Sequence, residues 1–476
     1  MSPWGLTWDA RGSVYFGRDD GRIWKVSAEG GLSAVTTCGE AEVAHVLPWP
    51  LAGEQALLYT VRKRWRSWGD DEVVAQTLTT GTRKVLLRDA ADARYVATGH
   101  LVFLRRGVLF AVAFDPERLE VRGTPAAVFD GVAQALTGNS TYDVTGAGQL
   151  AIAPTGTLAW VRGPVVPYPD GVLVSVDRHG QVSPLAAPVK SYGPSVRLAP
   201  GGRQLAVSVW SLSEISLWTH DLARGTLTPL AQGGEAESPV WTPDGQRLVF
   251  SWLKDGRLSL AWQRADGTTP PEVLAPGTLE PSSWTPDGRQ LAVTTGDAGG
   301  VAVATFENGR ATVQSLTQTP SSARWPEFSP DGHWLAYGSN VSGRLEVYVQ
   351  RYPGPGPRTQ VSIEGGASPA WHANGHELFF LSLPDAAGKR RMLVVGFEPG
   401  SPARIGAAQS LFEFAGRELY FMCSPTRCFD VAPDGQRFYV LQMRNPPPPP
   451  VVTHINLIQN WFEELKAKVP ATGQAK

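Results

Sequence analysis

The sequence has little cysteine, little charge and no long apolar run. Three cysteines in 476 residues are too few for a disulfide scaffold. Charged residues make up 18% of the chain and the formal net charge is −1, so no long-range field attracts nucleic acid or an anionic membrane. No stretch approaches the roughly 18 apolar residues of a membrane-spanning helix. We therefore expect no nucleic-acid partner and no insertion into a membrane.

Familiar catalytic motifs are also missing. A protein kinase needs a Gly-rich loop, a strand lysine, a His-Arg-Asp segment and an Asp-Phe-Gly segment, and the sequence holds no such set. It has no Gly-x-Ser-x-Gly elbow, which a serine hydrolase of the propeller peptidases would carry. His376-Glu377 begins like a zinc-protease motif but lacks the second histidine. We predict that the chain is not an enzyme and has no catalytic residue, metal or cofactor.

Turn-forming residues are plentiful, with 51 glycines and 39 prolines, and they fall in a repeat. The repeat is an aromatic or aliphatic residue, then Ser/Thr/Ala-Pro-Asp-Gly, two polar residues and an apolar run; we call it the turn motif. Clear copies lie at 241–250, 284–293 and 328–337, worn ones at 198–207, 371–380 and 431–440, and looser ones at Gly12, Gly53, Gly99 and Gly156. The spacing is near 43 residues, which is typical of the four-stranded blades of a β-propeller.

The chemistry of the turn motif predicts a hairpin. Proline fixes φ at the first corner, Asp accepts hydrogen bonds from backbone N–H groups two residues on, and Gly supplies the positive φ that ends the turn. The predicted structural turn residues are Asp244, Gly245, Asp287, Gly288, Asp331, Gly332, Asp434 and Gly435. A ring of Asp metal ligands is the alternative, and the preceding tryptophans could stack on a ligand instead of packing between blades.

The repeats predict an all-β fold of tandem propellers with about ten blades. We expect about four blades in an incomplete ring over 1–185 and a six-bladed ring over 186–476, with a short helix at 460–468. Two wider steps between repeats predict inserts around 138–143 and 400–417. The five prolines at 446–450 predict a stiff spacer on the last blade.

The turn motifs resemble the TolB-type, WD-like propeller repeat of bacterial envelope proteins. Nearly the whole chain is similar to the C-terminal sensor region of bacterial eukaryotic-type serine/threonine kinases, through residues 97–103, 107–112, 176–180, 221–227, 346–349 and 460–465. The resemblance implies an extracytoplasmic location, with about two more blades, a membrane span and the kinase domain upstream of Met1. The first residues themselves carry no basic and apolar leader that would predict export.

We therefore predict a non-catalytic binding or sensor module, a monomer that recognises a protein, peptide or envelope component at a propeller face. The alternatives are a structural part of a TolB-like envelope complex, and a hydrolase or lyase with its site on a propeller face. Cys423 and Cys428 could close a small loop in an oxidising compartment, but two reduced thiols in a turn fit equally well.

Overall fold

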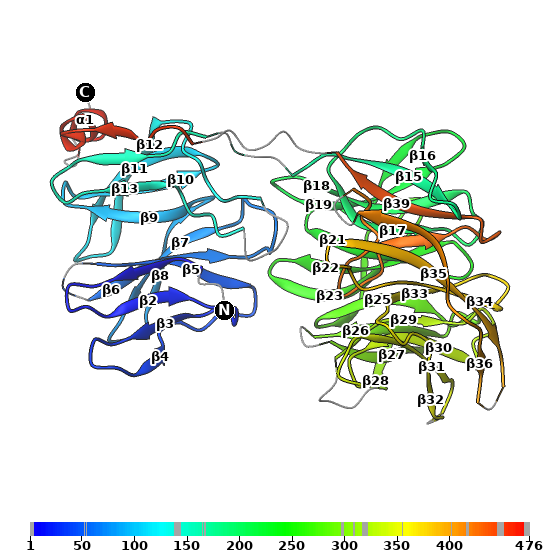
Figure 1. Cartoon of the computed structure of the whole chain (residues 1–476). Helices are drawn as coiled ribbons and strands as arrows, with labels where there is room; N and C mark the ends of the chain where they lie inside the picture. The colour runs from blue at the N-terminus through cyan, green and yellow to red at the C-terminus, as the bar shows by residue number, and fades with distance from the viewer. Residues whose placement is uncertain are drawn as a thin grey trace. The chain divides into compact units, whose positions relative to one another are not determined.

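The computed structural model describes residues 4–51, 53, 55–137, 144–163, 165, 168–296, 299–307, 310–316, 322–354, 356–400, 402–415, 418–444 and 452–470. These residues form two compact units (Figure 1). Unit 1 comprises Met1–Tyr168, Ser211–Glu214 and Pro447–Lys476, and unit 2 comprises Pro169–Trp210 and Ile215–Pro446. The predicted insert at 138–143 and the proline run at 446–450 lie outside the described residues.

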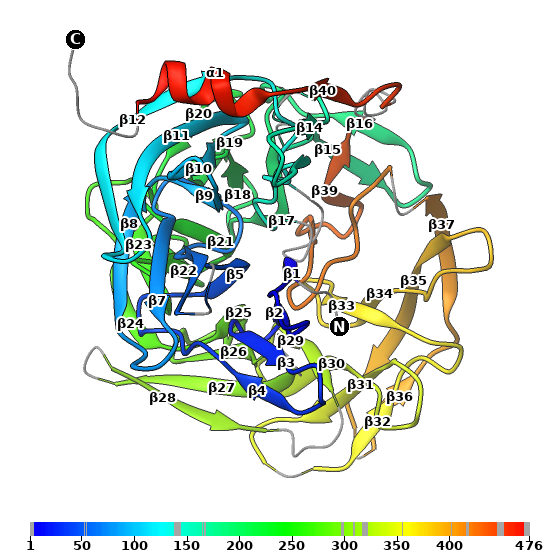
Figure 2. The same cartoon turned by 90° about the vertical axis from the view of Figure 1, so that its left-hand side faces the viewer.

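Unit 2 is built from groups of consecutive antiparallel strands that follow the repeat, and we call each group a blade; one parallel pair between β19 and β21 joins the first two blades into a single sheet. The blades surround a common centre (Figure 2). In chain order their strands are β17 (Tyr192–Leu198), β18 (Gln204–Trp210), β19 (Ile215–Asp221) and β20 (Leu227–Pro229); β21 (Glu235–Trp241), β22 (Arg247–Lys254), β23 (Arg257–Arg264) and β24 (Glu272–Pro276); β25 (Leu279–Trp284), β26 (Gln290–Thr295), β27 (Gly300–Glu307) and β28 (Arg310–Ser315); β29 (Ala323–Phe328), β30 (Trp334–Ser339), β31 (Glu346–Arg351) and β32 (Arg358–Gln360); and β33 (Ala367–Trp371), β34 (Glu377–Leu381), β35 (Lys389–Glu398), β36 (Arg404–Ile405) and β37 (Gln409–Ala415).

The last blade joins the two ends of unit 2. Its order is β16-β15-β39-β38, with β38 (Phe429–Val431) and β39 (Arg437–Met443) from the end of the unit and β15 (Gly171–Asp177) and β16 (Val182–Pro184) from its start. All seven residues of β15 pair with β39. The predicted boundary at 185/186 is therefore misplaced, because without β15 the outer edge of β39 would leave its hydrogen-bonding groups unpaired.

Packing between blades explains the apolar run after each turn motif. In β22, Leu248 and Phe250 join one buried cluster with residues of the preceding blade, whereas Val249 joins another with residues of the following blade. All three side chains have no exposed surface. A strand between two neighbouring sheets must be apolar on both faces, as a buried parallel strand is. Each such side chain contributes about 1.5–3 kcal/mol through burial.

Unit 1 holds sheets of the same kind and also the end of the chain. Its strands are β1 (Leu6–Trp8), β2 (Val14–Gly17), β3 (Ile23–Val26) and β4 (Leu32–Ala34); β5 (Ala44–Pro50), β6 (Ala56–Arg62), β7 (Glu72–Thr77) and β8 (Arg83–Arg88); β9 (Ala91–Val96), β10 (His100–Arg105), β11 (Val108–Asp115) and β12 (Glu120–Phe129); and β13 (Leu150–Ile152), β14 (Leu158–Trp160) and β40 (Asn456–Ile458). The last of these sheets has three described strands, so the total of about ten blades stays a prediction.

The C-terminal segment packs in unit 1, not on the last blade of unit 2 as predicted. β40 pairs antiparallel with β14, and the helix α1 (Trp461–Lys468) follows at once beside β12 (Figure 1). Trp461 and Leu465 are fully buried against strands of unit 1. The C-terminal segment packs there because β14 has an edge with which β40 can pair, and because α1 has an apolar stripe that must be covered. Among the described residues no helix has the length and apolarity to cross a membrane.

Candidate functional site

A cavity of about 400 Å³ lies in unit 2 where the innermost strands of the blades end. The innermost strands are β17, β21, β25, β29, β33 and β38, and each leads directly into a turn motif. The prolines of four turn motifs line the cavity, together with Trp241, Trp284, Phe328 and Trp371 from the ends of those strands. Its size and its aromatic lining with a few polar groups are typical of ligand-binding pockets.

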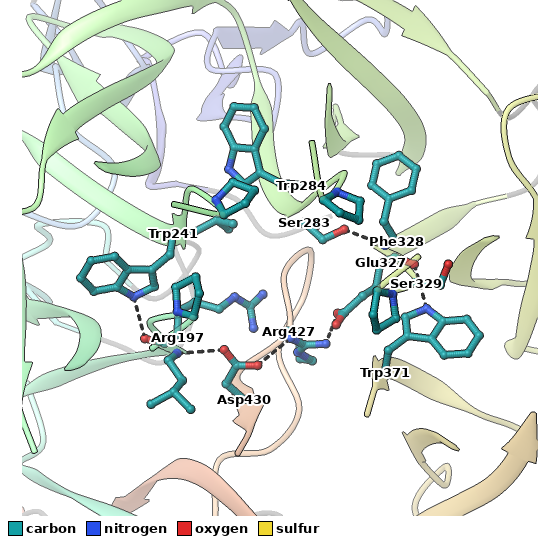
Figure 3. Close-up of a pocket in the computed structure, with 17 residues that line it drawn as sticks. Arg197, Trp241, Ser283, Trp284, Glu327, Phe328, Ser329, Trp371, Arg427 and Asp430 are labelled. Carbon is teal, nitrogen blue, oxygen red and sulfur yellow. Dashed lines mark hydrogen bonds and ion pairs between the residues drawn. The ribbon is translucent and has the colours of Figure 1, made fainter. Parts of the chain in front are cut away.

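One position of the repeat supplies three of the four charged residues that line this cavity. It is the penultimate residue of the innermost strand, directly before the first residue of the turn motif, and the six residues are Arg197, Val240, Ser283, Glu327, Ala370 and Asp430. All of them except Ala370 line the cavity. Three of these residues are charged, and the repeat brings them together from distant parts of the chain (Figure 3).

Arg427, in the loop before β38, links the two carboxylates. Its guanidinium forms ion pairs with Glu327 and, at 2.9 Å, with Asp430. It also donates to the carbonyl oxygens of Pro369 at 3.1 Å and Phe429 at 3.0 Å. The Asp430 carboxylate in turn accepts from the backbone N–H of Leu198 at 2.8 Å. Only 5% of the surface of Arg427 is exposed, and its buried guanidinium has both ion-pair and carbonyl partners.

Burial sets the electrostatics of the two arginines. It lowers the pKa of Arg427 to about 9, helped by the neighbouring positive charge of Arg197 and opposed by Asp430. Burial also lowers the pKa of Arg197, and Asp430 opposes that shift too. Both groups remain cations near neutral pH, so the cavity holds two positive charges beside two carboxylates.

A disulfide loop carries Arg427 into the cavity. Cys423 and Cys428 form a disulfide with their Cα atoms 5.5 Å apart. The Trp325 indole donates to the Cys423 carbonyl oxygen at 2.9 Å, and Thr426 lies 3.3 Å from the hydroxyls of Ser195 and Ser238. With the bond from Arg427 to Pro369, loop residues 423–428 therefore contact four innermost strands, β17, β21, β29 and β33. Cys38 is a free thiol in unit 1 whose pKa burial raises to about 11.

The turn residues named from the sequence lie just outside the cavity. Asp244, Asp287, Asp331 and Asp434 each accept a hydrogen bond from the backbone N–H two residues on, at 3.0, 3.1, 3.0 and 3.0 Å. Gly245, Gly288, Gly332 and Gly435 have φ of 67°, 69°, 72° and 65°. No cluster of three or more metal-ligating side chains occurs in the part of the chain that the structure describes.

The tryptophans of the turn motifs both pack between blades and line the cavity. The indole of Trp241 donates to the carbonyl oxygen of Arg197 in the preceding blade at 3.1 Å. Trp371 makes the matching bond to Glu327 at 3.2 Å. Trp284 at the same position has no hydrogen-bond partner for its buried Nε1 among the described residues. Packing between blades and stacking on a ligand, the two interpretations that the sequence left open, are therefore compatible for these tryptophans.

Sequence reasoning did not name the charged residues of the cavity. Arg197, Glu327 and Asp430 could have been found by aligning the repeats and reading the residue before each turn motif, because that position lines the cavity in five of the six blades. Arg427 carries no such signal, since it lies in a loop outside the repeat.

No protein-family model matches the chain, and no curated protein matches it. The sheet topology decides the fold. The chain folds as a β-propeller protein. Similar solved structures include a protein assigned as TolB from Agrobacterium tumefaciens, with 16% identity, 58% of this chain and 99% of that chain covered, and a TM-score of 0.48. The periplasmic gluconolactonase of Pseudomonas aeruginosa matches with 16% identity, coverage of 80% and 97%, and a TM-score of 0.35. An oligogalacturonate lyase in complex with manganese matches with 12% identity, coverage of 59% and 98%, and a TM-score of 0.39.

These structures correct one prediction. The chain was predicted not to be an enzyme because kinase and hydrolase motifs are absent. Propellers that are enzymes, a lactonase and a lyase, occur among the structures similar to this chain. The missing motifs therefore do not exclude catalysis, since a propeller can assemble a site from several blades without a local motif.

Proposed function

We propose that this chain is a binding and sensing module that receives a segment of a protein or peptide in the central cavity of unit 2. The observation that carries the proposal is the convergence of buried charged residues from separate blades in an aromatic-lined cavity of about 400 Å³. Burying charges costs folding free energy, so a set assembled at a cavity supports a binding role. The linkage to a kinase and the extracytoplasmic location stay predictions from family resemblance.

Binding of peptides to the full chain tests this proposal. A ligand that binds the native state raises the melting temperature by mass action. We expect members of a peptide panel to raise it, and a photo-cross-linking version of the best peptide to attach to segments that line the cavity. A panel without any stabilising member, or cross-links confined to unit 1, would contradict the proposal.

A second candidate is a lyase or hydrolase that acts on a ligand in the same cavity. Glu327 and Asp430 flank Arg427, so carboxylates and a cation lie together as acid–base chemistry on an anionic substrate requires. Mass spectrometry of cavity ligands incubated with the full chain tests this candidate. Turnover that E327Q abolishes without abolishing binding would establish it, and ligands recovered intact would reject it.

A further inference from the structure

Arg197 extends toward the middle of the cavity and meets Arg427 there (Figure 3). Only 4% of its surface is exposed. Its Nη1 donates to the carbonyl oxygen of Phe429 at 3.0 Å, the oxygen that also accepts from Nε of Arg427 at 3.0 Å. Two guanidinium groups therefore share one neutral acceptor in a buried place, where their like charges repel.

The charges around these two arginines are unevenly divided. Glu327 and Asp430 both pair with Arg427, whereas Arg197 has no ion pair within the described part of the chain. Asp430 attracts Arg197, but its oxygens already accept from Arg427 and from the backbone N–H groups of Leu198 and Val431. Arg197 is thus a buried cation that lacks a counter-ion of its own, an arrangement that costs several kcal/mol unless something compensates it.

Unused hydrogen-bond donors line the same cavity. Nε of Arg197, the hydroxyl of Ser282 and Nε1 of Trp284 are buried and lack a hydrogen-bond partner among the described residues. Trp241 and Trp371, at the position of Trp284 in other blades, do find carbonyl acceptors. Buried donors are normally satisfied, so three unsatisfied ones around one cavity make it suited to bind a group with acceptor oxygens.

We propose that the cavity binds a carboxylate of its ligand at Arg197, with Ser282 and Trp284 as additional donors. This inference rests on the proposed function and names the peptide's C-terminal carboxylate as the group recognised. A planar carboxylate matches the planar fork of a guanidinium, which can bind it through two parallel hydrogen bonds. A single negative charge also matches the single cation without a counter-ion. A phosphate would bring a second charge against Glu327 and Asp430.

Calorimetric titration of the full chain tests the inference with matched ligands. The probes are acetyl-Ala-Ala-Phe with a free C-terminal carboxylate, the same peptide amidated, D-galacturonate and inorganic phosphate. We expect the free acid to bind at least about tenfold more tightly than the amide, the size of effect that a hydrogen bond to a charged group gives. R197Q should remove that difference by weakening binding of the acid alone.

Two variants control for folding and for charge. R289Q removes an arginine whose side chain is 82% exposed in a turn of the same unit, and it should leave every affinity unchanged. R197K keeps the charge but not the fork, so its affinity for the acid should fall between the wild type and R197Q. The melting temperature of R197Q without ligand should equal or exceed that of the wild type, because the substitution removes a buried unpaired charge.

The other outcomes would contradict the carboxylate site, the peptide as its source, or the proposed function. Equal binding of acid and amide would overturn the carboxylate site and leave the proposed function standing. Binding of galacturonate without either peptide would support the carboxylate site and overturn the peptide source. Phosphate as the tightest ligand would overturn the match to a single negative charge. Binding of no probe by the folded chain would overturn both the inference and the proposed function.

Discussion

His220 in β19 shows how one buried side chain makes stability depend on pH. It has no exposed surface, and burial lowers its pKa below the ordinary value. The unfolded chain therefore takes up a proton more readily than the folded one as pH falls below about 6.5. Stability that is present above that pH is lost on acidification, by up to about 1.4 kcal/mol per pH unit until the folded pKa is reached.

We expect H220Q to flatten this acid loss. Melting temperatures between pH 7.5 and 5 should fall less for H220Q than for the wild type. H179Q is the control, because His179 is exposed in the turn between β15 and β16. Parallel curves for H220Q and the wild type would show that another group governs the acid response.

Two glycines of the turn motif differ in why a side chain is disfavoured: at one only the backbone conformation opposes it, and at the other there is also no space. Gly288 has φ 69°, and an added Cβ would lie 3.8 Å from its nearest neighbour, Cδ of Pro243, so only the positive φ opposes a side chain. Gly435 has φ 65°, but there a Cβ would overlap the His372 ring. G288A should therefore cost about 1–2 kcal/mol and G435A more.

Asparagine tolerates positive φ, so G288N should recover most of the loss of G288A, whereas G435N should recover little. Urea denaturation of the four variants measures these differences. Equal rescue at both sites would mean that the His372 ring moves aside freely.

At the scale of elements, the repeat predicts more than its turns. The hairpin, the Asp hydrogen bonds and the doubly buried strand such as β22 follow from local chemistry, and the structure has them. The repeat also predicts that Arg197, Glu327 and Asp430 lie around one axis, because the three residues occupy the same position when the blades are aligned on their turns. The disulfide loop that holds Arg427 is different, because its place depends on contacts with β17, β21 and β29 that no local pattern encodes.

Reduction of the Cys423–Cys428 disulfide should loosen this loop. The bond restricts a short loop in the unfolded chain, and such a restriction is worth about 2 kcal/mol for a ring of this size. A reductant should lower the melting temperature of the wild type and of C38S, which keeps the disulfide, but not that of C423S/C428S. If the reductant lowers all three alike, the loss does not come from this loop.

At the scale of the whole molecule, both units are completed by segments that the sequence order places elsewhere. β15 and β16 precede the predicted start of the second ring, yet they form half of its last blade. β40 and α1 follow the last turn motif, yet they pack in unit 1. Repeat spacing could not reveal either pairing, because a strand edge accepts any strand of suitable register and only the folded arrangement selects the partner.

These pairings predict which fragments fold. A fragment of residues 169–446 keeps β15, whereas 186–446 loses the seven residues that pair with β39 and also loses Leu173, Val174 and Val176 from two buried clusters. The longer fragment should unfold cooperatively and resist limited proteolysis, and the shorter one should aggregate through the exposed edge of β39 or be digested. Adding residues 447–476 to the shorter fragment is the control, because these belong with unit 1 and should restore nothing. Equal protease resistance of 169–446 and 186–446 would show that unit 2 closes without β15, and the boundary predicted at 186 would then stand.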